Sequence, residues 1–358
     1  MIIGIDANEA NVINRVGSNQ YAFNILLRLV KLDKQNQYVV YLKHQPVDDL
    51  PKPNDQLSYQ VIKSTPFWTQ WRLPLALYFS KPRPDLFFTL GHYGPKFAPM
   101  PTLITILDIA FLLFPKTFLK KDLFKLKHWT KNSVKKASHI ITISKATKRD
   151  IQKHYQVPED KITVAYPGID HQRFKPSKKS LISGDYLLYL GTLQPRKNLE
   201  NLVTAYSKLP EKYQANKLVI AGKKGWLFKP LFQLVKKLKL EGKIIFTDYV
   251  KDQDIPGLIQ KAKLLILPSY YEGFGIPVVQ AMAAGTPVLV SKNSSLKEIV
   301  QSHGFYIKQP FKARQVKQGI IQALTSRSDI NAAQNQANQF SWDRSAKNIL
   351  EAINELTI

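Results

Sequence analysis

One segment of the chain combines a carboxylate, two glycines and a predicted helix start. The apolar run Leu264–Leu267 predicts a strand, the loop after it holds Glu272, and Gly273 and Gly275 precede a predicted helix over 276–284. Glycine tolerates positive φ angles and lets a ligand approach the backbone. A helix start offers unpaired N–H groups to an anion. The segment therefore predicts a site for a ligand with an anionic group and hydroxyl groups. The helix start would bind the anionic group, and Glu272 could accept hydrogen bonds from the hydroxyls. The alternative is an ordinary strand–loop–helix unit in which the glycines only make the turn.

A pair of basic residues follows a second predicted strand, Tyr186–Leu190. Gly191 opens the loop, and Arg196 and Lys197 precede a predicted helix over 199–209. Two cations beside a helix N-terminus suit a diphosphate. The alternative is a solvated pair, which is common in a chain with 52 Lys and Arg residues.

Strand ends in the first half carry weaker signals. Gly17 precedes a helix and could approach a ligand, or Ser18 beside it could simply cap that helix. Asp108 follows the predicted strand Leu103–Leu107, a plausible place for an active-site carboxylate. His92 also lies near a strand end, but a lone histidine is more often a structural residue than a catalytic one.

The triplet Asp252-Gln253-Asp254 has the spacing of a DxD metal motif. Asp254 followed by Pro256 is, however, a good helix start, with Asp254 as the N-cap. The chain has no cysteine, which excludes disulfides and Cys-ligated zinc. We therefore predict no metal site.

Apolar runs of four or five residues alternate with helical patterns in both halves of the chain. This alternation predicts an α/β fold with two doubly wound, Rossmann-like domains facing a central cleft. The break falls in a linker rich in Pro, Gly, Ser and Lys, at 167–185. The predicted domains are 1–172, with the amphipathic C-terminal helix 340–358, and 183–339.

The string PSYYEGFGIPVVQAMAAGTPVLVS closely resembles the donor-site signature of glycosyltransferase family 4, the retaining enzymes of the GT-B fold. Within that family the chain is similar to bacterial mannosyltransferases. The resemblance implies that the terminal helix crosses back to the first domain, that the first domain lies on the acceptor side and that the second binds the donor. It also implies transfer of a mannose- or glucose-type hexose from a GDP- or UDP-sugar to a glycan or lipid-linked acceptor of the cell envelope, with retention of configuration and without metal or cofactor.

The resemblance also implies roles for individual residues. Lys197 matches a diphosphate-binding position, and Arg196 would supply a second charge because Thr192 stands where some members have arginine. Glu272 matches the first of two glutamates separated by seven residues. The implied catalytic residues are Glu272 and Asp108, and the implied donor-binding residues are Gly17, Arg196, Lys197, Glu272, Gly273, Phe274, Gly275, Ile276 and Gln280.

Two positions depart from the family pattern. Gln280 replaces the second glutamate, which holds the ribose hydroxyls, and its amide can form only uncharged hydrogen bonds. Leu107 replaces a histidine that lines the reaction centre. These departures motivate an alternative function, a weakly active or non-catalytic relative that binds nucleotide sugars.

The net charge of +26 attracts polyanions. Twelve Lys or Arg and two acidic residues lie in 116–154, where the helical pattern is basic and amphipathic. Such a helix suits an anionic membrane surface, and a solvated face of a core helix is the alternative. We expect a cytoplasmic protein that docks on the inner face of the cell membrane. No signature of specific nucleic-acid binding occurs.

Overall fold

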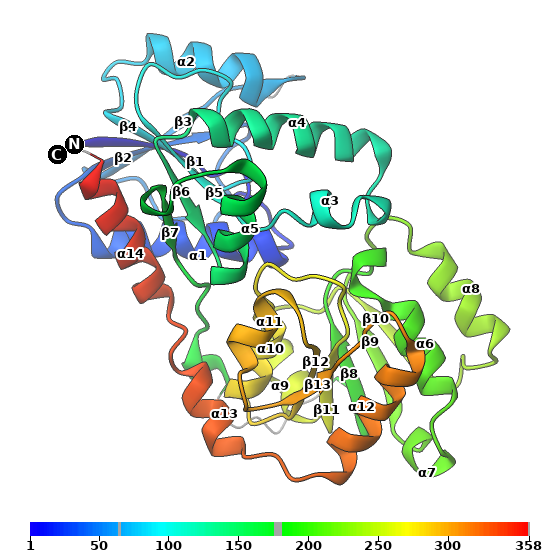
Figure 1. Cartoon of the computed structure of the whole chain (residues 1–358). Coiled ribbons are helices and arrows are strands. Elements are labelled where there is room, and N and C mark those ends of the chain that lie inside the picture. The colour runs from blue at the N-terminus through cyan, green and yellow to red at the C-terminus, as the bar shows by residue number, and fades with distance from the viewer. Residues whose placement is uncertain (64–65, 175–180, 357–358) are drawn as a thin grey trace. The chain divides into compact units, whose positions relative to one another are not determined.

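The computed structural model describes residues 1–63, 66–174 and 181–356, and these form two compact units (Figure 1). Unit 1 comprises Met1–Leu113, Lys120–Gly168 and Ser341–Ile358; unit 2 comprises Phe114–Leu119 and Ile169–Phe340. The predicted linker 167–185 includes residues 175–180, which lie outside the described residues. The short segment Phe114–Leu119 belongs to unit 2, although the predicted domain boundaries placed it in the first domain.

Unit 1 is built on a parallel sheet of seven strands in the order β3-β2-β1-β4-β5-β6-β7. Its central strands consist of buried apolar residues because helices cover both faces, as parallel sheets require. The register pairs Ile5 of β1 with Val40 of β2 and with Phe88 of β4. The strands are β1 (Ile2–Asp6), β2 (Gln37–Leu42), β3 (Leu57–Val61), β4 (Leu86–Thr89), β5 (Thr102–Ile106), β6 (His139–Thr142) and β7 (Ile162–Val164).

The helices of unit 1 include the C-terminal one, α14, which packs beside α1 (Figure 1). The rings of Tyr21 on α1 and Trp342 on α14 lie 6.2 Å apart. Gly168 passes so close to this helix start that a Cβ there would lie 2.0 Å from the Trp342 nitrogen. The expected return of the terminal helix to the first domain is confirmed. The helices are α1 (Gly17–Leu32), the π-helical turn η1 (Trp68–Arg72), α2 (Leu73–Phe79), α3 (Ala110–Leu113), α4 (Lys120–Lys136), α5 (Lys145–Tyr155), η3 (Glu159–Lys161) and α14 (Trp342–Glu355).

Unit 2 repeats the architecture with six parallel strands in the order β10-β9-β8-β11-β12-β13. The strands are β8 (Tyr186–Leu190), β9 (Lys217–Ala221), β10 (Ile244–Asp248), β11 (Leu264–Leu267), β12 (Val288–Ser291) and β13 (Phe305–Ile307). The helices are η2 (Pro115–Thr117), η4 (His171–Phe174), η5 (Pro195–Lys197), α6 (Leu199–Ser207), α7 (Glu211–Gln214), α8 (Lys229–Lys237), α9 (Ile255–Gln260), α10 (Ile276–Ala283), α11 (Ser294–Val300), α12 (Ala313–Thr325) and α13 (Ile330–Ala337).

The two doubly wound sheets confirm the predicted fold class, and one strand was missed. β3 lies at an edge and is half-exposed, so its sequence LSYQV mixes polar and apolar residues and lacks the apolar run of a buried strand. In each sheet the strand order reverses between two central neighbours, β1 and β4 in unit 1 and β8 and β11 in unit 2. The crevice beyond the carboxyl ends of such a pair is where open α/β sheets bind ligands.

Candidate functional site

The reversal point of the unit 2 sheet brings the two most informative sequence segments together. β8 and β11 pair directly, with Leu187 opposite Leu264, so the loops that follow them leave the sheet side by side. The amide of Tyr270 donates to the carbonyl of Arg196 at 2.9 Å. The side chain of Asn198 donates to the carbonyl of Pro268 at 2.9 Å. These bonds fasten the loop after β8 to the loop after β11.

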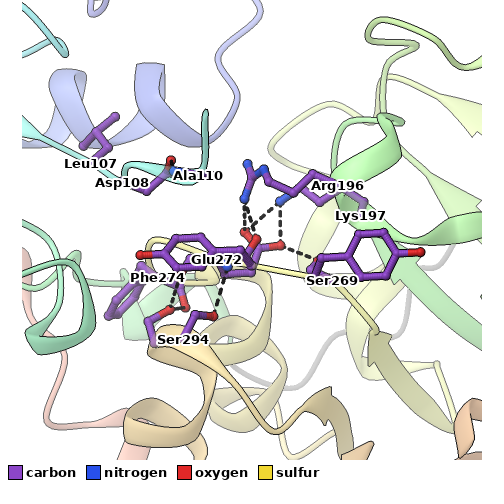
Figure 2. Close-up of polar contacts among 12 residues, drawn as sticks. Leu107, Asp108, Ala110, Arg196, Lys197, Ser269, Glu272, Phe274 and Ser294 are labelled. Carbon is purple, nitrogen blue, oxygen red and sulfur yellow. Dashed lines mark hydrogen bonds and ion pairs between the residues drawn. The ribbon is translucent and has the colours of Figure 1, made fainter. Parts of the chain in front are cut away.

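The loops carry a cluster of two cations and one carboxylate, shown in Figure 2. Lys197 Nζ donates to both carboxylate oxygens of Glu272, at 2.6 and 2.8 Å. A guanidinium nitrogen of Arg196 lies 3.6 Å from Oε2 of the same carboxylate. All three side chains are at most 14% exposed. The cluster therefore brings two positive charges and one negative charge together in a nearly buried place, where a charge acts more strongly than in water.

Glu272 is anionic in this cluster. Burial alone would raise its pKa, but the charges of Lys197 and Arg196, with hydrogen bonds from Lys197 and Ser269, outweigh it and hold the pKa of Glu272 below its ordinary value. A carboxylate in this state orders the two cations and accepts hydrogen bonds.

Three serines position the loop that carries Glu272, and the sequence patterns did not single them out. Ser269 Oγ, which is fully buried, donates to Glu272 Oε1 at 2.6 Å. The amide of Glu272 donates to Ser294 Oγ at 3.0 Å. Ser295 Oγ donates to the carbonyls of Glu272 and Phe274, at 2.8 and 2.9 Å. The start of α11 thus fixes the backbone of the loop, whereas Ser269 holds the Glu272 carboxylate. The contacts from α11 could be found only in the tertiary structure.

Glycines make the close approaches that the site requires. Gly191 after β8 has φ of 151°, and a Cβ on Gly222, after β9, would lie 2.1 Å from the Gly191 carbonyl oxygen. Gly275, of the two glycines singled out near Glu272, has the positive φ, 105°, and it is the residue that precedes α10. A side chain at Gly275 would be strained and would meet Leu296 at 2.8 Å.

The remaining predicted residues of this segment differ in exposure. The Phe274 ring is buried against Phe340, with centroids 5.3 Å apart. Its side chain therefore packs in the core, and its backbone forms part of the loop. Ile276, the first residue of α10, and Gln280, one turn further along, are half-buried. Gly273 is buried within the same loop.

The residues predicted at the reversal point of unit 1 form a separate group. A Cβ on Gly17 would meet nothing within 4 Å, so its backbone is open to a ligand. Ser18 does not cap α1, because the helix begins at Gly17 after Val16; its hydroxyl instead donates to Glu9 Oε2 at 3.3 Å. Asn19 donates to the same carboxylate oxygen at 2.8 Å. Ser18 was therefore wrong as a cap because Asn19 and Glu9 organise this turn.

Asp108 and Leu107 follow β5. Asp108 Oδ1 accepts a hydrogen bond from the amide of Ala110 at 2.9 Å, so it shapes the start of α3. Leu107 is buried, and its carbonyl accepts from the hydroxyl of Thr147 at 3.4 Å. His92 lies after β4 and is half-buried.

The DxD triplet lies at a helix start. Asp254 precedes α9, with Pro256 in the first turn, but its carboxylate makes no capping hydrogen bond; the predicted position is right and the predicted bond is wrong. Asp252 forms an ion pair with Arg173 at 3.8 Å. Among residues 1–63, 66–174 and 181–356, no three His, Asp or Glu side chains gather as metal ligands would.

Comparisons with known proteins agree with this geometry. The family model Glycosyl transferases group 1 matches residues 171–340, and Glycosyltransferase Family 4 matches 17–173. The chain is 32% identical over 280 residues to the O-antigen chain mannosyltransferase B of Escherichia coli, covering 73% of each. It superposes on a sucrose-phosphate synthase from Thermosynechococcus elongatus with TM-score 0.80 and 18% identity over 99% of this chain and 98% of that one. It also superposes on Anabaena HepE in complex with UDP and glucose, with TM-score 0.76 and 18% identity over 99% of each.

Proposed function

Since the chain belongs to glycosyltransferase family 4, and is thus a glycosyltransferase with the GT-B fold, we propose that it transfers a mannose- or glucose-type hexose from a GDP- or UDP-sugar to a glycan or lipid-linked acceptor, with retention of configuration. The Escherichia coli relative is named a mannosyltransferase of the O-antigen chain, which supports mannose and a cell-envelope glycan. The complex of Anabaena HepE with UDP and glucose supports a uridine donor. Both GDP and UDP are therefore proposed as the nucleotide of the donor.

The observation that carries this proposal is the cluster of Arg196, Lys197 and Glu272 at the unit 2 reversal point. When the glycosidic bond of the donor breaks, negative charge grows on the diphosphate that leaves. Two cations already held in place stabilise that charge without reorganising first. We propose that Lys197 and Arg196 bind the diphosphate, that Glu272 accepts hydrogen bonds from the donor sugar, and that no metal is required.

The other donor contacts follow from the same arrangement. The turn through Gly273 and Gly275 and the start of α10 at Ile276 would bring backbone N–H groups to the donor, and the backbone of Phe274 continues this turn. Gln280 on α10 would bind the ribose hydroxyls. Gly17 and Asp108 of unit 1 are proposed on the resemblance to the family, Gly17 as a donor contact and Asp108 at the reacting centre.

Binding and turnover test the proposal together. Calorimetry on the full chain would compare GDP, UDP and their mannose, glucose and N-acetylglucosamine conjugates, and one nucleotide should bind with a clear preference. Transfer to a sugar acceptor would then be followed by NMR of the new anomeric centre, which reports retention or inversion. Binding without any turnover would favour the non-catalytic alternative, which Leu107 and Gln280 motivate. No binding of any nucleotide would overturn both.

We further propose that the enzyme acts at the inner face of the cell membrane. The lysines of α4 support this, because seven of them, at 120, 121, 125, 127, 131, 135 and 136, are exposed on one helix of unit 1. Such a row attracts anionic lipid headgroups. No helix within the described residues has the length and apolar character needed to cross a membrane.

A further inference from the structure

The turn η1 and helix α2 of unit 1 carry apolar side chains on two opposite faces. The inner face, with Trp68, Leu73 and Leu77, packs into a core cluster with Tyr41 and Phe87. The outer face is 42–79% exposed, although it is equally apolar. A surface helix normally exposes polar residues on the side opposite its apolar face, so the packing of unit 1 does not explain the exposed apolar residues of the outer face. It consists of Phe67, Trp71, Leu75, Tyr78 and Phe79, here called the outer stripe.

The spacing of the outer stripe makes it one continuous surface. Trp71, Leu75 and Tyr78 follow one another at intervals of four and three, so they share one side of the helical segment. Phe67 precedes this segment and Phe79 ends it. Phe97 extends the stripe sideways, because its ring lies 5.9 Å from that of Trp71 and 6.0 Å from that of Tyr78. A contiguous apolar surface with aromatic residues marks an interaction site rather than a chance exposure.

The charges around the outer stripe have one sign. From Gln56 to Pro84 the sequence has no Asp or Glu. Lys63, Arg72, Lys81 and Arg83 in that range are all exposed. Lys96, which is also exposed, lies over the Trp71 ring, 4.5 Å from its centroid. The apolar surface is therefore bordered by cations alone over this stretch.

The outer stripe is joined to the lysines of α4 through direct contacts. The rings of Phe67 and Trp129, on α4, lie 6.5 Å apart, and Lys125 lies 5.9 Å from the Trp129 ring. Lys136 Nζ donates to the carbonyl of Lys96 at 2.7 Å. Figure 1 shows α2 and α4 along the same edge of unit 1. On α4 itself, Phe124 is 70% exposed, whereas Leu123, Leu126 and Trp129 are half-buried, so α4 is mainly a charged surface.

We propose that the outer stripe inserts into the interfacial region of an anionic lipid bilayer, while the surrounding cations and α4 bind the headgroups. Trp and Tyr rings favour that region because they are apolar with one polar atom. Apolar burial combined with cations strengthens binding to anionic lipid. The inference rests on the proposed function for its purpose, because a lipid-linked acceptor would be reached from such a surface. It assigns the apolar anchoring to η1–α2 instead of to the basic segment 116–154.

A flotation assay on the full chain tests the assignment, using phosphatidylcholine vesicles with and without phosphatidylglycerol. The double variant Trp71→Ser, Phe79→Ser changes only exposed side chains, so the fold should persist. We expect it to lower partitioning into anionic vesicles by roughly tenfold or more, because two aromatic side chains lose their lipid contact. Ile330→Ser, an exposed apolar residue of α13 in unit 2, is the matched control and should partition like the wild type.

Salt separates the two parts of the surface. Raising ionic strength screens the lysines, so the wild type should retain residual binding through the outer stripe, and the double variant should retain much less. Quenching of tryptophan fluorescence by brominated lipid should be weaker in Trp71→Phe, which keeps an apolar ring. Equal partitioning of wild type and double variant, or a wild-type dimer that the double variant converts to a monomer, would overturn the proposal.

Nucleotide binding without vesicles keeps the two proposals distinguishable. The double variant should bind the preferred nucleotide as the wild type does, since the outer stripe belongs to unit 1 and the cation cluster to unit 2. If the wild type binds vesicles but no nucleotide, the donor proposal fails while the membrane assignment stands. If it binds nucleotide but partitions equally with the double variant, the membrane assignment alone fails.

Discussion

The reversal points of the two sheets share one topology and carry opposite chemistry. In unit 2 the loops after β8 and β11 hold Arg196 and Lys197 around one carboxylate. In unit 1, Asp6 is the last residue of β1 and Glu9 lies in the loop after it. Their carboxylates accept hydrogen bonds from the side-chain amides of Asn8 and Asn19. Arg15 in the same loop is engaged elsewhere, in a bidentate pair with Asp49 at 2.5 and 2.8 Å.

Two sheets of the same topology thus carry different side chains on the loops beyond their central strands, and the chemistry of a site comes from such side chains and not from the fold. Cations at a reversal point suit a diphosphate. Carboxylates and amides accept and donate hydrogen bonds without attracting an anion, which suits the hydroxyl groups of a neutral sugar. Burial raises the pKa of Asp6 against the hydrogen bonds from Asn8, so unit 1 even disfavours further negative charge. The comparison predicts donor effects from variants of the Arg196, Lys197 and Glu272 cluster in unit 2 and an acceptor effect from a variant of Glu9 in unit 1.

The largest effect is expected from removing the Lys197 cation of the unit 2 cluster. In Lys197→Met the leaving diphosphate would lose one of the two cations proposed to bind it, and turnover should fall by about 10²–10³-fold, as for loss of one preorganised donor. Glu272 would also lose its main partner, so the melting temperature should drop. Steady-state kinetics and thermal unfolding measure both effects. Lys237→Met, an exposed lysine at the end of α8, is the control, and equal losses in the two variants would contradict the assignment.

Neutralising Glu272 should have opposite effects on the binding of the nucleoside diphosphate and on the transfer of the sugar. Glu272→Gln keeps the size of the side chain but removes the negative charge beside the two cations, so GDP or UDP should bind more tightly, by about tenfold. Transfer should slow, because the donor sugar loses its charged acceptor of hydrogen bonds. Calorimetry with the nucleoside diphosphate and kinetics with the sugar conjugate give the two signs. Weaker binding of the diphosphate would show that Glu272 itself supports the phosphate site.

The same carboxylate predicts a dependence of stability on pH. The pKa of Glu272 is lowered from 4.5 in the folded protein. Its ionised form therefore stabilises the fold above pH 4.5, and this contribution is lost as the pH falls through the folded-state pKa. Thermal unfolding of wild type and Glu272→Gln should differ in pH dependence below 4.5, where the wild type loses an additional increment of stability. Parallel profiles would argue against an ionised Glu272.

A variant of Glu9 in unit 1 tests whether this unit binds the acceptor. Glu9→Gln removes a carboxylate that Ser18 and Asn19 hold in place. We expect KM for the acceptor to rise about fivefold, as for one weakened charged hydrogen bond, and the donor affinity to stay unchanged. Kinetics with each substrate varied in turn separate the two constants. A change confined to the donor would show that Glu9 belongs to the donor site.

The smallest effect is expected at Gln280. Gln280→Glu introduces a charged acceptor at the position proposed for the ribose hydroxyls, and charged hydrogen bonds are stronger than neutral ones. The nucleotide sugar should bind a few-fold more tightly, by about 1 kcal/mol. Calorimetry checks this, and an unchanged affinity would place Gln280 away from the ribose.

Most elements were predictable because parallel strands that are buried on both faces consist of short, nearly continuous apolar runs. The bounds of β8 and β11 match the expected ranges. The loops that follow β8 and β11 were recognisable as candidate sites because cations, glycines and a carboxylate stood at strand ends. β3 was missed because an edge strand needs no continuous apolar run. The alternative of a helix cap at Ser18 was wrong because the Ser18 hydroxyl donates to Glu9 and the helix begins after Val16.

The sequence by itself determined the alternation of strands and helices, the family signature and the chemical types at each strand end, since these depend on residues close together in the chain. Only the tertiary structure decided which of them meet. Lys197 and Glu272 are 75 residues apart, and the pairing of β8 with β11 brings them within hydrogen-bonding distance. The tertiary structure also decided which serines hold the Glu272 loop and which apolar residues of η1 and α2 stay exposed. Burial and partnership are properties of the packed chain, because they depend on neighbours that no local pattern specifies.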